Sequence, residues 1–225
     1  MKISKKYLIF SPILAVILVG TFVLTSEAQI ANTPSSCLPT DMAQVKVGFP
    51  IKTPSALPNG YSLQGIQVND PNRSVTFYYA DHSLCKFPYF DTSGSQLTIG
   101  VVKELNLEGH AIYSADGKIQ GYNQTQLPPM TSLAFQQAII NQSKDPNFHM
   151  VANVQPININ GYNGVGWDPY DTFSVVTKSG TIVNKEPYHG NGAIMFLNDK
   201  DQVVYTMGGN FTLNQLMNVA KSITQ

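Results

Sequence analysis

The chain has 225 residues, no net formal charge at pH 7 and only 12% charged residues, while 43% are hydrophobic and 10% aromatic. This composition is that of a folded domain and excludes a disordered tail. Only one arginine, Arg73, is present, and no basic patch or basic helix occurs, which argues against nucleic acid as a partner.

An apolar segment near the N-terminus predicts where the protein resides. Residues 7–24 carry no charge, and Lys2, Lys5 and Lys6 stand just before them. This asymmetry predicts that the N-terminus stays in the cytoplasm while the rest of the chain crosses the membrane. The small residues Ser26 and Ala28 fit a cleavable signal peptide. Eighteen residues, about 27 Å as a helix, also come close to the length of a membrane anchor. Both alternatives stay open.

The sequence predicts three segments. Residues 1–28 are a signal peptide or signal anchor, 29–48 a polar linker with a short helix, and 49–225 a single extracytoplasmic domain. We therefore expect a protein that is secreted or anchored to the cell membrane with its C-terminus outside. It meets the membrane through the N-terminal segment if that segment is uncleaved. The exported part has 11 basic and 13 acidic residues, so its net charge is about −2.

Three short strands are predicted in the first half of the domain. A proline-rich stretch at 49–61 favours an extended edge segment and a turn at 58–60. Hydrophobic residues then alternate at 61–68, 75–79 and 97–101. The alternation shifts register at Gly65, which predicts a bulge there. Short turns between these strands indicate an antiparallel meander.

The middle of the domain is less regular. Residues 106–130 have an ambiguous pattern with a hairpin turn at 115–118. A helix is then expected to begin at Thr131 or Ser132 and to end before Pro146. Its apolar face is predicted to consist of Leu133, Phe135, Ala138, Ile139 and Ile140.

The last third returns to strands and closes with the most regular helix. Strands are expected around 154–159, 173–177, 181–183, 193–197 and 203–207. Thr212 and Gln215 form the sequence signature of a capping box, and an apolar face continues to Ile223. Together the elements predict an α+β fold, with a single antiparallel, meander-like β-sheet and two main helices covering a face.

Two stretches resemble a known family. The first is Phe49-Pro50 to Pro54 with Leu57-Pro-Asn-Gly-Tyr61; the second is 157–164 with 193–196, 204–207 and the closing helix. They are similar to a family of unknown function that occurs as the extracytoplasmic domain of membrane-anchored bacterial and archaeal proteins, including some anti-sigma factors and sporulation-related lipoproteins. The resemblance covers about two thirds of the exported part and omits 106–150, which suggests an insertion. It implies an exported sensory or binding domain and no catalytic residues.

Two cysteines occur, Cys37 and Cys85. In an exported chain they are expected to form one disulfide. The bridge would stabilise the fold by roughly 4 kcal/mol in the chain-entropy model. The alternative is a copper or zinc site with His82. One histidine and one thiolate are too few ligands, so the sequence predicts no metal site.

Four Asn-x-Ser/Thr patterns are candidate glycosylation sites in an exported protein. Their acceptor residues are Asn72, Asn123, Asn141 and Asn210.

No pattern of a known catalytic centre occurs. The chain has no His-Glu-x-x-His motif, no phosphate-binding loop and no Gly-x-Ser-x-Gly elbow. The glycine-rich run at 161–166 has the wrong spacing for a dinucleotide loop, so a turn or bulge is expected there. The sequence therefore predicts no cofactor and no catalytic residues. The four histidines lie far apart in the chain: His82, His110, His149 and His189.

The stretch 164–171 contains the only tryptophan. Gly164 and Gly166 allow backbone conformations with positive φ and Pro169 stiffens the exit, so a loop that can present aromatic contacts is expected. The predicted contact residues are Trp167, Asp168, Tyr170 and Asp171. The alternative is that Trp167 packs in the core.

The sequence favours an exported, non-catalytic binding or sensing domain whose ligand it does not specify. Two alternatives come from other classes: an extracellular hydrolase with dispersed catalytic residues, and a small copper or zinc carrier. A pocket where histidines and carboxylates converge would favour the hydrolase. A continuous sheet face without a polar pocket would favour binding.

Overall fold

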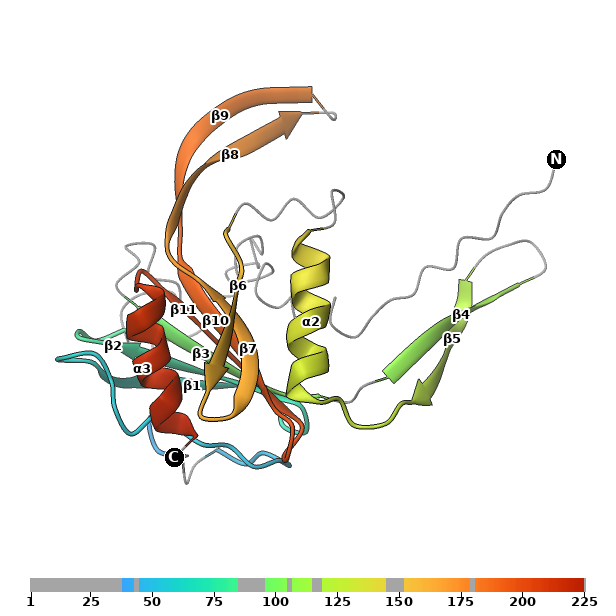
Figure 1. Ribbon diagram of the computed structural model, residues 1–225, viewed down its shortest axis with the longest axis horizontal. Helices are drawn as coiled ribbons and strands as arrows, with labels where there is room; N and C mark the ends of the chain where they lie inside the picture. The colour runs from blue at the N-terminus through green and yellow to red at the C-terminus, as the bar shows by residue number, and fades with distance from the viewer. Residues whose placement is uncertain are drawn as a thin grey trace. The chain divides into compact units, whose positions relative to one another are not determined.

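A computed structural model describes residues 38–42, 45–84, 96–104, 107–114, 119–144, 152–178 and 181–224 (Figure 1). Contacts along the chain separate two compact units. The smaller includes 105–130, and the larger includes 31–104 and 131–225. Each unit is described by itself.

The described part of the smaller unit is a β-hairpin. Strands β4 (Leu107–Tyr113) and β5 (Ile119–Gln126) pair antiparallel as a two-stranded sheet. The ambiguous region of the sequence is therefore a hairpin. Its predicted turn at 115–118 lies outside the described residues.

The larger unit is built on a seven-stranded sheet. Its order is β1-β2-β3-β11-β10-β7-β6, and every neighbouring pair is antiparallel. This confirms the predicted antiparallel sheet, its opening meander and, through a register shift between Leu63 and Gly65, the bulge. The strands are β1 (Ser62–Asp70), β2 (Ser74–Ala80), β3 (Leu97–Lys103), β6 (Gln155–Ile159), β7 (Tyr162–Trp167), β10 (Gly192–Asn198) and β11 (Val203–Gly209).

Two helices pack on this sheet, on opposite faces. Figure 1 shows α2 (Ser132–Ser143) and α3 (Leu213–Ile223) on either side of β6 and β7. Helix α3 contacts β6, β10 and β11, and α2 contacts β6, β7 and β10. The predicted α+β class is confirmed, but the helices do not share a face. The reason is that β7 and β10 bury apolar side chains on both faces, including Val165 and Leu197 opposite α3.

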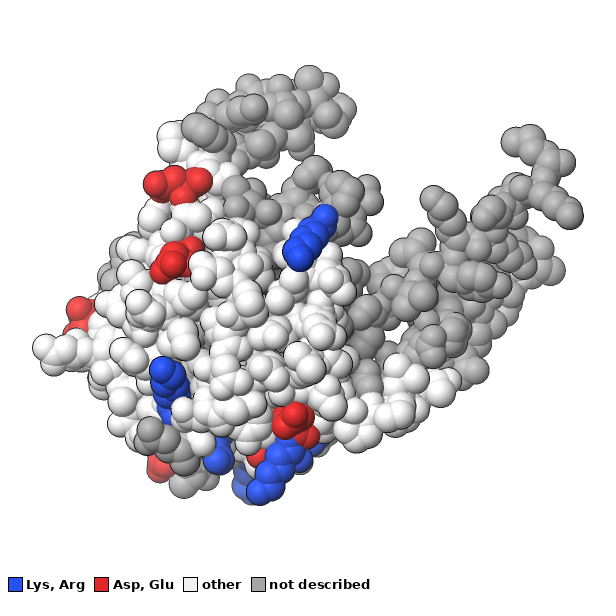
Figure 2. All heavy atoms as spheres, viewed as in Figure 1, with Lys and Arg blue, Asp and Glu red and all other residues white. Residues whose placement is uncertain are grey.

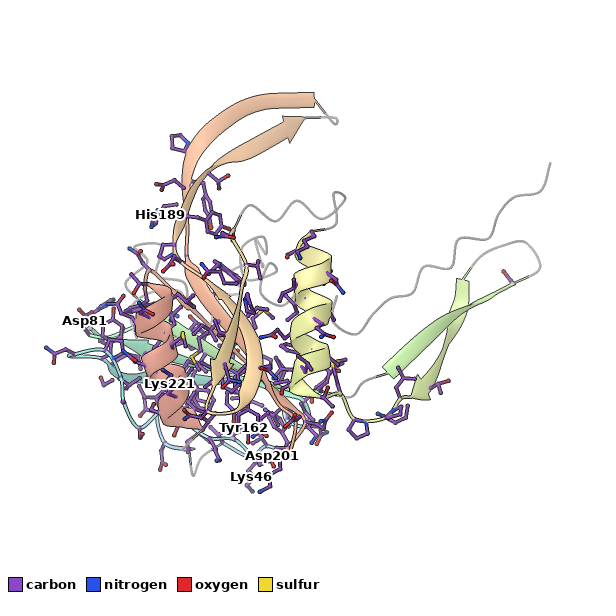
Figure 3. The ribbon with its side chains drawn as sticks, viewed as in Figure 1. Lys46, Asp81, Tyr162, His189, Asp201 and Lys221 are labelled. Atoms are coloured by element: carbon purple, nitrogen blue, oxygen red, sulfur yellow. The ribbon has the colours of Figure 1, made fainter. Side chains whose placement is uncertain are left out.

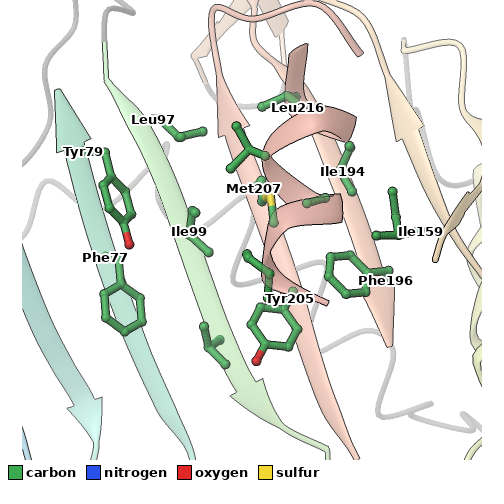
Figure 4. Packing of buried hydrophobic residues seen from close by; sticks show 14 of the residues in the cluster. Phe77, Tyr79, Leu97, Ile99, Ile159, Ile194, Phe196, Tyr205, Met207 and Leu216 are labelled. Atoms are coloured by element: carbon green, nitrogen blue, oxygen red, sulfur yellow. The ribbon is translucent and has the colours of Figure 1, made fainter. Parts of the chain in front are cut away.

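The larger core lies between the sheet and α3 (Figure 4). Phe196 and Tyr205 stack at its centre, with ring centroids 5.1 Å apart and planes 9° apart. Leu216 and Ile223 of α3 are buried in the same cluster. The predicted capping box is present: Thr212 caps α3 and the Gln215 side chain returns to the cap backbone. Burial of this apolar stripe is what holds the closing helix on the sheet.

Helix α2 corrects the predicted apolar face. Thr131 caps it as expected. Leu133, however, is 49% exposed, and Gln136 is buried instead beside Phe135 and Ile139. The Gln136 amide donates hydrogen bonds to the carbonyls of Ile157 (2.9 Å) and Gly164 (2.6 Å). A buried glutamine is accommodated because its amide finds backbone acceptors in the sheet.

Two predictions concern the segment before β1. Tyr61 N–H donates to the Pro58 carbonyl (3.0 Å) and Gly60 has φ +82°, which confirms the turn at 58–60. Within the described part of the predicted linker helix, Val45 N–H donates to the Met42 carbonyl (3.0 Å), and residues 43 and 44 lie outside the described residues.

A second hairpin leaves the sheet between β7 and β10. Strands β8 (Tyr170–Lys178) and β9 (Thr181–Gly190) form a two-stranded ribbon of their own (Figure 1). Among the described strands they pair only with each other. They are longer than the sequence pattern predicts, because alternation at their polar ends carries no hydrophobic signal.

Among the described helices, none is long and apolar enough to span a membrane. The predicted export segment at 7–24 lies outside the described residues.

Candidate functional site

The sheet face opposite α3 changes character across its width. Over β7 and β10 it is apolar, with Val165, Met195 and Leu197 buried, and α2 makes its contacts there. Over β2, β3 and β11 the side chains pointing the same way are mixed: threonines and glycines are half-buried, whereas Val204, Tyr78 and Ala80 are buried. Successive residues of a strand alternate between faces, so each of these strands is apolar toward α3, and on this side it carries threonine or glycine together with fewer apolar residues.

The strand registers place two rows of residues across this side of the sheet. The first row crosses β1, β2, β3 and β11, and the second runs from β2 through β3, β11 and β10 to β7. Apart from Tyr78, which is buried, all members are half-exposed, and none is charged. We call these nine residues the open face: Gln67, Thr76, Gly100 and Thr206 in the first row, and Tyr78, Thr98, Gly208, Ala193 and Trp167 in the second.

Hydrogen bonds hold the polar side chains of the open face in place. The Tyr78 hydroxyl donates to Gln67 Oε1 (2.7 Å). The Asn69 amide donates to Thr76 Oγ1 (2.8 Å), and the Gln96 amide to Thr98 Oγ1 (3.1 Å). The Thr76 and Thr98 hydroxyls keep a donor hydrogen and further acceptor capacity for another group, whereas the Thr206 hydroxyl donates to the Gly100 carbonyl (3.3 Å). The face therefore offers oriented, uncharged hydrogen-bonding groups.

Trp167 lies at one end of the second row, paired with Ala193. Its indole N–H donates to the Asn191 carbonyl (3.2 Å), and its side chain is half-exposed. The tryptophan is therefore neither a core residue nor a freely exposed one. One hydrogen bond orients the ring, and part of the ring is accessible to solvent.

The Asp168 side chain binds the backbone of helix α3 and is not part of a solvent-facing loop. Its Oδ1 accepts a hydrogen bond from Leu213 N–H (2.7 Å), in the first turn of the helix. A carboxylate here satisfies a free backbone donor and interacts favourably with the positive end of the helix dipole. The sequence pattern around Asp168 gives no sign of this partner, which lies 45 residues away.

Tyr170 and Asp171, the other predicted contact residues, are consecutive in β8 and so point to opposite faces of the ribbon. Tyr170 lies over Gly190, where an added Cβ would be 2.4 Å from the phenol ring. Burial raises the pKa of Tyr170, with a smaller contribution from Tyr188. The four predicted contact residues therefore have different surroundings, and Trp167 alone belongs to the open face.

Asp171 forms a polar cluster with His189 and Asn210. His189 Nδ1 lies 2.8 Å from Asp171 Oδ1, and its Nε2 lies 3.3 Å from Asn210 Oδ1. Figure 3 shows His189 on the β8–β9 ribbon. The side chains of His189 and Asp171 are 53% and 92% exposed. This is an acid–base pair open to water, with both ring nitrogens already facing oxygen atoms.

We predict that His189 keeps its proton to higher pH than a free histidine. The hydrogen bond to Asp171, then that to Asn210, raises its pKa above the ordinary 6.5. The stabilisation is fully present below the pKa of the unfolded chain and is lost as pH rises through the folded pKa. An NMR titration of the imidazole should show a midpoint above 6.5, and Asp171→Asn should lower it. A midpoint unchanged by that substitution would contradict the assignment.

The remaining histidines do not join this cluster within the described residues. His82 Nδ1 lies 2.7 Å from Asp81 Oδ1, in another exposed pair. His149 and the side chain of His110 lie outside the described residues. No group of three histidine, cysteine or acidic side chains capable of holding a metal ion is found in the part of the chain that the structure describes.

The glycosylation candidates occupy different settings. Asn72, in the β1–β2 turn, and Asn141, in the last turn of α2, are exposed. Asn210 is exposed next to His189, and the side chain of Asn123 in β5 lies outside the described residues. Their modification stays a prediction.

The predicted Cys37–Cys85 disulfide also lies outside the described residues. Leu38 and Leu84, their neighbours in sequence, pack in one small cluster with Tyr78 and Ala80, and the pairing stays a prediction. We expect the unfolded, unreduced protein to contain no titratable thiol, and the reduced protein two. Two thiols before reduction would refute the bridge.

Comparison with known proteins found no significant match for this chain. No family model matches it, and neither a curated protein nor a solved structure is significantly similar to it.

Proposed function

We propose that this chain is an exported, non-catalytic domain that binds a ligand through the open face of its sheet. Three features support export: the uncharged segment 7–24, the lysines before it, and the resemblance to extracytoplasmic domains of membrane-anchored proteins. The cysteines and the glycosylation patterns fit the same compartment.

The observation that carries the binding proposal is the contrast between the two sides of β2, β3 and β11. Toward α3 these strands bury Phe77, Ile99 and Met207 completely or nearly so. On the open face, the residues beside them in sequence are Thr76, Gly100 and Thr206, and they are half-exposed and uncharged. A solvated sheet face usually carries charged side chains. A sheet face that is uncharged and lined by small and polar residues is suited to close contact with another molecule.

The low charge is a property of the surface around the fold as well. Figure 2 shows a group of basic and acidic side chains at the lower edge of the view and only isolated charges elsewhere on the described surface, with wide uncharged areas between them. Recognition by such a protein depends on shape and hydrogen bonding more than on long-range attraction.

The Asp171–His189 pair is the feature that would support the hydrolase alternative. A general base needs a free nitrogen within reach of the reacting proton, and here both ring nitrogens face Asp171 and Asn210. The pair also lies open to solvent, where a charge-stabilising site loses most of its strength. Binding is therefore the function that the geometry favours.

Binding can be tested on the full chain, isotopically labelled in detergent, with fractions of the producing cell's envelope and culture medium. Backbone amide shifts should move mainly at β2, β3 and β11, and Thr76→Lys/Thr206→Lys should abolish the change. Asn218→Lys is the matched control, because Asn218 is exposed on α3, on the opposite side of the sheet. Shifts centred on α3, or retained in the double variant, would contradict the proposal.

Export is tested separately. Protease added to intact cells should degrade the domain, and full protection in the cytoplasm would exclude an extracytoplasmic function.

A further inference from the structure

We propose that the ligand of the open face is a neutral oligosaccharide, an inference that rests on the proposed function. It follows from three properties of the nine residues: their lack of charge, their fixed hydrogen-bonding groups, and the single tryptophan at the end of a row of small side chains.

The lack of charge selects against ionic ligands. The open face has threonine, glutamine, tyrosine, tryptophan, glycine and alanine side chains only. A carboxylate, phosphate or ammonium group placed there would lose hydration without gaining an opposite charge. Nucleotides, anionic lipids and basic peptides are therefore poor matches, whereas a neutral polar molecule incurs no such cost.

The polar groups suit a ligand rich in hydroxyls. Thr76 and Thr98 each accept a hydrogen bond from a neighbouring amide, at 2.8 Å and 3.1 Å, which orients the hydroxyl and leaves it able to donate outward. A sugar hydroxyl can both donate and accept, so it can pair with every such group. A ligand without hydroxyls would leave these groups unpaired on contact, which disfavours purely apolar partners.

The tryptophan supplies the apolar part of the contact. Trp167 is held by its hydrogen bond to Asn191, and its large amphipathic ring can stack on the C–H face of a sugar. Ala193 and Gly208 separate it from Thr98 in the same row. Three strand spacings correspond to roughly 14 Å. This is the reach of a few sugar units lying flat, with one end on the ring and the other among the hydroxyls.

The single tryptophan also makes the test direct, because all indole fluorescence comes from Trp167. The full chain, in a detergent without a sugar headgroup, is titrated with neutral tetrasaccharides of glucose, xylose, mannose and N-acetylglucosamine. At least one should shift the emission in a saturable way. A polyanionic oligosaccharide of equal length should bind more than tenfold more weakly.

A steric variant checks the location. At Gly208 an added Cβ meets only Gly192 O, at 3.7 Å. Gly208→Val is therefore compatible with the fold, but its larger side chain projects from the open face. It should weaken binding more than tenfold, with an unchanged melting temperature or a higher one. Asn218→Ala, on the exposed side of α3, should leave binding unchanged.

The outcomes separate this inference from the proposed function. If none of the tetrasaccharides shifts the emission, or Gly208→Val binds as tightly as the parent, the saccharide inference is wrong. If a non-saccharide fraction then still moves the amides of β2, β3 and β11, the binding function stands with another ligand. If the open face responds to neither, both are wrong.

Discussion

Replacing Phe196 by alanine should lower the free energy of unfolding by about 3–5 kcal/mol. Phe196 is fully buried beneath α3 and stacks on Tyr205 with ring centroids 5.1 Å apart. Truncation removes the buried ring and leaves a cavity that the flanking strands β7 and β11 cannot fill without breaking their pairing with β10.

Urea or guanidinium unfolding of the two proteins, followed by circular dichroism, measures this change. Leu133→Ala is the control, since Leu133 is 49% exposed on α2 and its loss should change stability by less than about 0.5 kcal/mol. Equal effects of the two substitutions would mean that the sheet is not packed against α3 as described.

Gly164→Ala should destabilise the fold by about 1–3 kcal/mol or more, whereas Gly208→Ala should be neutral or mildly stabilising. An added Cβ at Gly164 would lie 2.3 Å from Met195 O and 2.7 Å from Phe196 Cβ, so the backbones of β7 and β10 would have to separate. At Gly208 the nearest atom would be 3.7 Å away.

The comparison is well matched, because both glycines lie in strands of the same sheet. Thermal unfolding of the two variants measures it. If both are tolerated, the close approach of β7 to β10 is not required. If both are destabilising, the small side chains of the open face serve packing, and its role in binding loses support.

Most of the secondary structure could be predicted from local pattern. Alternation in β2 and β3, the bulge near Gly65 and the capping box of α3 all depend on residues close together in sequence. Helix α2 was predicted by its cap, Thr131, but its buried face was not. Gln136 is buried because it finds backbone acceptors 21 and 28 residues away. The helical periodicity of a sequence carries no information about such distant partners.

The predicted contact site was altered more strongly. The turn or bulge expected at 161–166 and the loop expected at 164–171 are wrong over most of their length, because β7 runs to Trp167 inside the sheet and β8 begins at Tyr170. Asp168 turned out to bind the first turn of α3, 45 residues ahead, and Asp171 to face His189 across the ribbon. The open face was missed, although its signal was present. Thr76, Thr98 and Thr206 alternate with buried residues in three strands, and only their joint register across the sheet turns scattered threonines into one surface.

By itself the sequence determined the α+β class, most of the strands and the cap of the last helix, because these depend on composition and on contacts within a few residues. Only the tertiary structure decided which side of each strand is covered. Alternation shows that the two sides of a strand differ, but not which helix packs on either of them. Helix α2 covers one half of the sheet opposite α3, because the apolar residues of β7 and β10 lie side by side there. The half over β2, β3 and β11 carries mainly threonines and glycines beside a few apolar residues such as Val204, which give a helix less apolar surface to bury.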